Sequence, residues 1–245
     1  MPATYETEAV VLRSIRYSEA DAVLALSTRE KGRVSAIAKG ARKTTSRLGG
    51  RLQPGVLALV SIHEGRGDLG TIRAASVIDA HAGLWTEGHR LQSAACVLET
   101  VMRVMPEYEP SEEAWHLLTR TLALLARAPA PPGPARLDPL VLGCQAKLLV
   151  VSGLLPLLTV CARCGAGPPL PAFSAASGGA VCDGCGAGAE PVEPGALAAL
   201  AQLVGRPLSE AAEALPRESA AGTERLIGLV LREHLGVRLR SAAPL

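Results

Sequence analysis

Apolar and polar residues alternate in five short runs within the first 80 residues of the chain. The runs are EAVVLRSIRY (8–17), DAVLALST (21–28), RVSAIAKG (33–40), VLALVSIH (56–63) and LGTIRAASVI (69–78). A period of two in segments rich in β-branched residues is typical of strands that bury one face. Five such strands, with a longer excursion after the third, predict a small closed or partly closed barrel such as an OB-fold.

The apolar spacing changes to a helical period after residue 85. Helices are predicted over 89–105, 111–127, 138–153 and 224–236, the last among two or more helices that follow residue 193. Ser111 and Asp138 suit helix starts because their side chains can cap free amide groups, and Gly236 suits a helix end. The proline-rich segment APAPPGPA (128–135) is predicted to be a loop.

These patterns predict a multidomain α+β protein: an N-terminal OB-fold barrel and a C-terminal α-helical bundle with an inserted four-cysteine module. The predicted segments are 1–80 for the barrel, 81–157 and 191–245 for the two parts of the helical domain, and 158–190 for the four-cysteine module. A hydrophobic fraction of 48% is sufficient for such cores, and aromatic residues are scarce at 2%, so Ala, Leu and Val must fill them.

Neither a signal peptide nor a membrane span is predicted. No apolar run follows Met1, and the most apolar stretch, Leu140–Val160, is interrupted by Gln145, Lys147 and Pro156. We therefore expect a buried helix there and a cytoplasmic protein that does not contact membranes.

Positive charge is concentrated in one part of the chain. Residues 1–80 hold twelve Lys/Arg against eight Asp/Glu, a net +4, whereas the whole chain has a net charge of only +2. The basic segment, 31–51, carries seven cations and no carboxylate: Lys31, Arg33, Lys39, Arg42, Lys43, Arg47 and Arg51. It lies in the excursion after the third predicted strand.

The basic segment is either a solvated loop or a surface for a polyanion. The lack of compensating acids and a position beside the groove of an OB barrel favour nucleic acid. Tyr5 and Tyr17 are candidates for base stacking, although core roles suit them equally. Binding would then depend mainly on phosphates, with a slope of log K against log salt of roughly −3 to −4 if about 4–6 phosphates of a single strand are neutralised.

Four of the six cysteines form a C-x₂-C pair, seventeen intervening residues and a second C-x₂-C pair: Cys161, Cys164, Cys182 and Cys185. Two such turns can complete a tetrahedral shell, so the spacing predicts one structural Zn²⁺ per chain. An iron–sulfur cluster uses the same ligands, and a redox pair is a further alternative; two disulfides are disfavoured in the cytoplasm. Cys96 and Cys144 are expected in the helical core.

No motif in the sequence indicates catalysis. The five histidines are scattered, GGRLQPG lacks the Lys-Ser/Thr ending of a P-loop, and GRGDLG lacks a dinucleotide-binding context. A closed four-thiolate shell leaves no open metal position, and no His-x-Glu accompanies the cysteines. We therefore predict no catalytic residues and a protein that is not an enzyme.

The chain resembles the RecO family of bacterial DNA repair proteins along nearly its whole length. The matching stretches are VVLRSIRYSEADAVLALSTREKGRVSAIAKGARKTTSR (10–47), LQPG (52–55), and CARCG with FSAASGGAVCDGC (161–185). The resemblance implies a recombination mediator of the RecFOR pathway that binds single- and double-stranded DNA and anneals complementary strands. It also implies RecR and the C-terminal tail of single-strand-binding protein as partners, and help in loading RecA.

By the same resemblance, DNA contact falls to Lys39, Arg42, Lys43, Arg47 and Arg51, with Lys31 and Arg33 as further candidates. The tail of single-strand-binding protein would need an apolar pocket rimmed by cations, which the sequence does not locate. An RNA-binding OB/zinc-ribbon module of the ribosome or tRNA machinery is the main alternative, and a nuclease is a third. Annealing of complementary DNA strands distinguishes the first interpretation from the second, and metal-dependent cleavage identifies the third.

Overall fold

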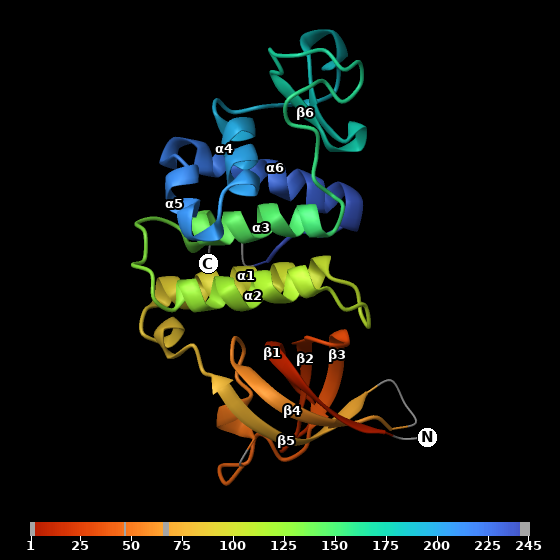
Figure 1. The fold of residues 1–245 in the computed structure, drawn as a ribbon, viewed down its shortest axis with the longest axis vertical. Coiled ribbons are helices and arrows are strands. Elements are labelled where there is room, and N and C mark those ends of the chain that lie inside the picture. The colour runs from red at the N-terminus through yellow and green to blue at the C-terminus, as the bar shows by residue number, and fades with distance from the viewer. Residues whose placement is uncertain (1–2, 47, 66–68, 241–245) are drawn as a thin grey trace. The chain divides into compact units, whose positions relative to one another are not determined.

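The computed structural model of the chain describes residues 3–46, 48–65 and 69–240. The chain forms two compact units, Met1–Pro129 and Ala130–Leu245. The first contains a β-barrel followed by two helices, and the second contains further helices and a small three-stranded sheet (Figure 1). The predicted α+β class, with an OB-like barrel at the N-terminus and helices after it, is confirmed.

The barrel consists of five strands in the closed order β1-β2-β3-β5-β4. Their bounds are Thr4–Arg16 for β1, Ala22–Thr28 for β2, Gly32–Ala38 for β3, Leu57–His63 for β4 and Gly70–Asp79 for β5. All neighbouring pairs are antiparallel except β3 and β5, which is the connectivity of an OB-fold.

The predicted alternation is visible in the burial of the strands. Every second residue of β2 and β3 is buried, and these side chains fill the barrel with Ala, Val and Leu. The long excursion after β3 contains turns and a short 3₁₀ helix, Gly49–Arg51, in place of a regular helix. Its polar and basic side chains are therefore not tied to a helical face.

Helices α1 (Gly88–Val104) and α2 (Glu112–Leu125) complete the first unit. The Ser111 side chain accepts a hydrogen bond from the amide of Ala114, so this residue caps α2 as its sequence context predicted. The connection between the two helices returns to the barrel, where Gly32 has φ +68° and packs directly against the backbone of Glu109. A side chain at position 32 would meet that backbone, so glycine is required there.

The second unit contains α3 (Pro139–Val151), α4 (Ala196–Gly205), α5 (Ala211–Ala214) and α6 (Arg217–Leu235). Its small sheet has the order β7-β6-β8, with bounds Ala172–Ser174 for β6, Gly179–Val181 for β7 and Glu190–Pro191 for β8. The apolar helix α3 is largely buried, as expected, and its start is capped by Asp138. Among the described residues, no helix has both the length and the hydropathy needed to cross a membrane.

Helix α6 begins seven residues before the predicted start at residue 224. Its first turns are built from small residues, among them Ser219, Ala220 and Gly222, which are buried. An added Cβ on Gly222 would lie 2.9 Å from the Cβ of Ala196, so α6 and α4 approach closely at this point. The prediction relied on large apolar side chains, and a helix contact made of small ones escaped it.

The predicted division into four segments remains a prediction. The compact units group the chain differently, because α1 and α2 belong to the unit of the barrel whereas α3 belongs to the second unit. Both of these sets of helices fall within the predicted first part of the helical domain, 81–157.

Candidate nucleic-acid interface and metal centre

The predicted DNA-contacting cations lie at opposite ends of strand β3. Lys31 and Arg33 flank its first residue, and the others come after its last residue, Ala38. Arg33 and Lys39 are six residues apart, which at roughly 3.3 Å per residue separates the two groups by about 20 Å along the strand. Arg47 lies outside the described residues. The basic segment therefore forms two separate groups of cations in the fold.

Lys31 is engaged by an acid and an aromatic ring. Its Nζ lies 2.6 Å from Oε1 of Glu64 and 4.1 Å from the centre of the Tyr5 ring. Burial, followed by the negative charge of Glu64 and the nearby Tyr108, raises the pKa of Tyr5 to about 12. Tyr5 is therefore a covered, neutral part of this cluster and does not offer an open ring face to a base.

Arg33 is tied to the connection between α1 and α2. Its Nη1 lies 2.8 Å from Oε1 of Glu107, and its Nε donates a 3.1 Å hydrogen bond to the carbonyl of Met105. The amide of Tyr108 in turn donates to the carbonyl of Arg33. The Arg33 guanidinium thus joins the barrel to its helices and has its charge balanced locally.

The loop after β3 is fixed to the loop between β1 and β2. Asp21 Oδ1 accepts a 2.8 Å hydrogen bond from the amide of Gly40, and the amide of Asp21 donates a 3.0 Å bond to Ser18 Oγ. Gly40 has φ +69°, a left-handed conformation that glycine adopts at low cost. Residues 17–21 and 39–42, which both lie within the stretch 10–47 that resembles the RecO family, therefore form one hydrogen-bonded structure.

Arg42 strengthens the same junction. Its amide donates a 2.9 Å bond to the carbonyl of Ala20, and its Nη1 donates to the carbonyls of Ser18 at 2.9 Å and Glu19 at 3.0 Å. These acceptors are neutral carbonyls, so the charge of the exposed guanidinium is not cancelled by the groups that hold it.

The remaining cations of this group are exposed. Lys39 and Lys43 have no ion-pair or hydrogen-bond partner for their ammonium groups among the described residues. Arg51, in the 3₁₀ helix, donates a 3.1 Å bond to the carbonyl of Ala75 on β5. The basic end of the barrel is defined here as Lys39, Arg42, Lys43 and Arg51.

Three exposed arginines near this end were not predicted from the sequence: Arg13, Arg16 and Arg73. Arg16 pairs with Ala22 on β2, which pairs with Ala38 at the end of β3. On the parallel strands β3 and β5, Ile37 pairs with Thr71. Lys39 and Arg73 each lie two residues beyond this pair, so they reach the same end of the barrel. Strand pairing brings Arg16 and Arg73 to the basic end, whereas in sequence they lie outside the basic segment. Arg13 pairs with Ala25, which pairs with Ser35, and so lies level with the middle of β3.

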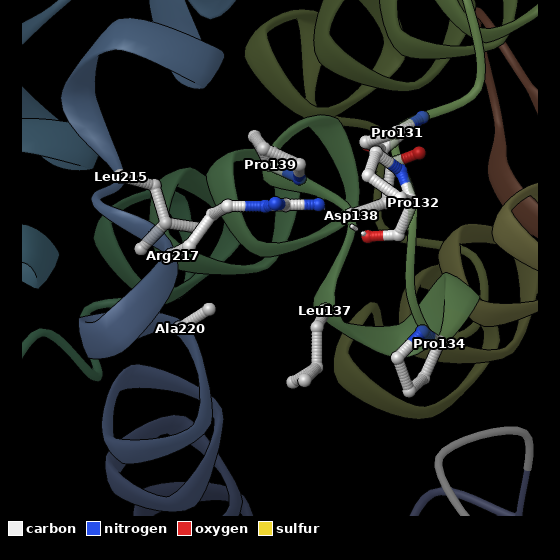
Figure 2. A pocket seen from close by; sticks show the side chains of 9 residues that line it. All are labelled: Pro131, Pro132, Pro134, Leu137, Asp138, Pro139, Leu215, Arg217 and Ala220. Carbon is white, nitrogen blue, oxygen red and sulfur yellow. Dashed lines mark hydrogen bonds between the residues drawn. The ribbon is translucent and has the colours of Figure 1, made fainter.

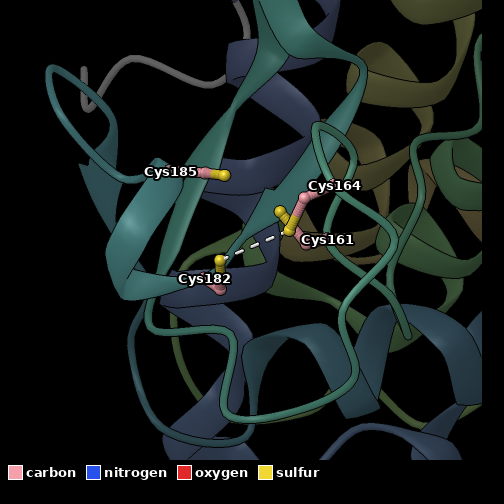
Figure 3. Close-up of side chains that lie close together, drawn as sticks. All are labelled: Cys161, Cys164, Cys182 and Cys185. Atoms are coloured by element: carbon pink, nitrogen blue, oxygen red, sulfur yellow. Dashed lines mark hydrogen bonds between the residues drawn. The ribbon is translucent and has the colours of Figure 1, made fainter.

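The four sulfurs of the C-x₂-C pairs converge on one point (Figure 3). Their Sγ atoms all lie within 4.8 Å of one another, and those of Cys164 and Cys182 are 3.7 Å apart. Four thiolates bound to one Zn²⁺ at roughly 2.3 Å would be separated by about 3.8 Å, so the cluster has the size of a tetrahedral metal shell. None of the six cysteines forms a disulfide, and Cys96 and Cys144 are buried in helices, as expected.

The thiols of this cluster have opposed proton affinities. Hydrogen bonding from the backbone of Cys182 is the main cause that lowers the pKa of Cys161 to about 6. Side-chain hydrogen bonding with Cys164 and then with Cys182 raises the pKa of Cys185 to about 12, because these bonds favour its protonated form. A bound cation would remove that conflict, since it stabilises all four groups as thiolates.

Arg163 links the two cysteine pairs. It lies between Cys161 and Cys164, its Nη1 donates a 2.8 Å bond to the carbonyl of Cys185, and its Nε donates a 2.9 Å bond to Ser177 Oγ. Buried apolar residues beneath the cluster, including Leu170, Ala180 and Val181, pack with Cys161. The geometry is therefore supported by contacts within the module.

An apolar pocket of about 110 Å³ lies in the second unit, between the proline-rich loop and the starts of α3 and α6 (Figure 2). Its walls include Pro131, Pro134, Leu137 and Leu215. The guanidinium of Arg217 extends over it and donates a 3.3 Å bond to the carbonyl of Pro132. The pocket thus combines largely apolar walls with one exposed cation, Arg217, and the buried carboxylate of Asp138.

Family models and curated relatives both match this chain to RecO proteins over most of its length. The family model described as "Recombination protein O N terminal" matches residues 1–81, and the one described as "Recombination protein O C terminal" matches residues 86–243. A DNA repair protein RecO from Anaeromyxobacter dehalogenans is 38% identical over 94% of this chain and 91% of its own. The DNA repair protein RecO of Rubrobacter xylanophilus is 36% identical over 99% and 95%, and that of Frankia casuarinae is 40% identical over 82% and 81%.

Proposed function

Because this chain belongs to the RecO family, we propose that it acts in DNA repair and recombination by binding DNA strands at the basic end of its barrel. The observation that carries the proposal is the fixed position of that group: the loop that bears Lys39, Arg42 and Lys43 is hydrogen-bonded to the 17–21 loop, and its cations have no acidic partner among the described residues. Cations held this way can bind phosphates without a further entropic cost for ordering their loop.

The same surface suits annealing. Two complementary strands repel each other through their phosphates, and a cationic surface that holds one strand lowers the repulsion felt by the second. Base pairing then supplies the driving force. No catalytic group is needed for this process, and we assign none.

A salt series tests the proposal directly. We expect the wild-type chain to bind single- and double-stranded DNA, with a slope of log K against log salt for single strands of roughly −3 to −4, which corresponds to about 4–6 neutralised phosphates. It should also accelerate duplex formation by two complementary oligonucleotides. A slope near zero, or preference for folded RNA without annealing, would contradict the proposal and favour the solvated loop or the RNA-binding alternative.

Membership of the family further implies protein partners. We propose that the chain engages RecR and the C-terminal tail of single-strand-binding protein, and thereby helps RecA load onto DNA that is coated by that protein. The tail is acidic and apolar, and the pocket beside Arg217 offers apolar walls and a cation. A synthetic tail peptide should bind the chain, and Arg217→Glu should weaken its binding at least about tenfold by replacing attraction with repulsion. Unchanged peptide binding by this variant would assign the tail elsewhere.

The cysteine cluster is proposed to hold one structural Zn²⁺. Cys161, Cys164, Cys182 and Cys185 would supply all four ligands, which leaves no position for a reacting water. The metal would stabilise the fold of 158–190, because it binds the folded module and not the unfolded chain. Metal analysis should give one zinc per chain, and Co²⁺ in its place should show the visible bands of a tetrahedral thiolate site. Iron with sulfide would instead identify a cluster.

A further inference from the structure

The outer face of strands β1, β2 and β3 is covered over only part of its length. Where Arg33 points outward, the α1–α2 connection lies on the sheet through Met105 and Glu107. Toward the other end of these strands, outward side chains remain exposed or half-buried. This uncovered part continues directly into the basic end of the barrel.

The uncovered part presents two rows of side chains across the three strands. Register pairs Ile15 with Val23 and Val23 with Ile37, which gives an apolar row. The adjacent row joins Arg13 to Ala25 and Ser35. Their inward neighbours, such as Leu24, belong to the barrel core, so both rows face outward. The open face is defined here by Arg13, Ile15, Tyr17, Val23, Ala25 and Ile37.

Tyr17 stands at the end of the open face. Its amide donates a 3.1 Å bond to the carbonyl of Asp21, which extends the β1–β2 ladder by one step and keeps Tyr17 in phase with Ile15. Its side chain is 64% exposed, and that of Ile15 is 45% exposed. The loop that holds Tyr17 is the one on which the Arg42 guanidinium is anchored.

We propose that the open face is a stacking platform for an unpaired nucleic-acid strand, with one base on the ring of Tyr17 and the next against Ile15, Val23 and Ile37. Arg13 contacts the phosphates of these nucleotides, and the strand continues to the basic end. The proposal rests on the proposed DNA-binding function and specifies its substrate class as strands with accessible bases.

Charge and shape favour this occupant. The two rows contain no carboxylate, and cations lie within and beside them, which suits a polyanion. Small residues at positions 25 and 35 leave a shallow apolar surface beside an aromatic ring. A duplex presents phosphates and buries its base faces, so it can use the cations but not the ring. Stacking on aromatic side chains is how OB-folds bind single strands with little sequence preference.

The test uses the full chain and three probes of equal length: a thymine oligonucleotide, an abasic oligonucleotide with the same phosphates, and a blunt duplex. Tyr17→Ala should weaken binding of the thymine oligonucleotide about 5- to 150-fold, because a stacked base contributes roughly 1–3 kcal/mol. Binding of the abasic strand and of the duplex should change less than about twofold, since their phosphate contacts remain. Tyr17→Phe should restore thymine binding, and Ile78→Ala, a truncation of an exposed residue on β5, should leave it unchanged.

A second readout does not depend on affinity. In Tyr17→Trp, the thymine oligonucleotide should quench the fluorescence of the new indole and the abasic strand should not. Equal loss of all three probes in Tyr17→Ala, or no loss of any, would overturn the stacking platform. If the wild-type chain binds none of the probes, both the stacking platform and the proposed DNA-binding function are wrong. If variants of the basic end lose binding while Tyr17→Ala does not, only the stacking platform is wrong.

Discussion

The two ends of strand β3 carry the same residue types, yet they differ in electrostatic state. At the first end Lys31 is paired with Glu64, just after β4, and Arg33 is paired with Glu107 in the α1–α2 connection. At the second end the cations are anchored by neutral carbonyls or have no partner among the described residues. A run of basic residues therefore indicates a binding surface only where the fold leaves its charge unbalanced.

Charge reversal at the basic end should give the largest effect. In Lys39→Glu/Arg42→Glu/Lys43→Glu, DNA affinity at low salt should fall by at least on the order of 100-fold, because three attractive phosphate contacts become repulsive. Fluorescence anisotropy with labelled oligonucleotides measures the change, and circular dichroism checks the fold. The control Arg103→Glu/Arg120→Glu/Arg127→Glu makes the same change in net charge on α1, on α2 and just after α2, and should bind far better. Equal loss in both variants would mean that net charge, and not this end of the barrel, determines binding.

Loosening the loop should have the next largest effect. Asp21→Ala leaves the amide of Gly40 without its acceptor and should lower the free energy of unfolding by about 1–2 kcal/mol, as measured by urea denaturation. DNA affinity should fall a few-fold even though a negative charge has been removed. Asp21→Asn retains an acceptor oxygen and should be close to wild type in both measurements. An increase in affinity for Asp21→Ala would show that the carboxylate opposes DNA more than it positions the loop.

Releasing the paired cations provides the converse test. Glu64→Gln/Glu107→Gln should strengthen DNA binding about two- to fivefold at low salt, and each cation that gains a phosphate should add roughly −0.7 to the single-strand salt slope. The measurement is the same salt series used for the wild type. No change in slope would mean that bound strands do not reach this end of β3, whatever the state of its charges.

The smallest effect concerns pH. The pKa of Tyr5 is raised to about 12 from an ordinary value of 10.0, so the folded chain holds this proton more tightly than the unfolded chain does. The free energy of unfolding should be unaffected by Tyr5 below pH 10 and should fall as the pH rises from 10 toward 12. Tyr5→Phe should remove this part of the decline in denaturation experiments. An identical decline in the variant would place its cause at other groups.

Local patterns predicted most of the elements. The strands of the barrel were expected close to their observed bounds, although β1 starts at Thr4, four residues before the predicted run, because its first residues pair with β4. The caps at Ser111 and Asp138 followed from short-range chemistry. The start of α6 could not be predicted in this way, because its small residues give no periodic apolar signal and are buried only by packing against α4.

The candidate sites likewise include residues that the sequence alone predicts and residues that only the tertiary structure brings together. Four cysteines in two close pairs define a chelate by their spacing, so the four ligands of the metal centre follow from the order of residues along the chain. The partners of Lys31 and Arg33 could not be predicted in this way, since they are 33 and 74 residues away in sequence. Arg16 and Arg73 reach the basic end through strand register, which depends on the closure of the barrel.

The sequence by itself determined the class of the fold, the family and the residues able to bind a metal, because periodicity, motif and spacing act over short distances along the chain. The tertiary structure alone decided which cations remain unbalanced and which side chains share the open face. Charge and exposure depend on neighbours that strand pairing and helix packing bring together from distant parts of the sequence.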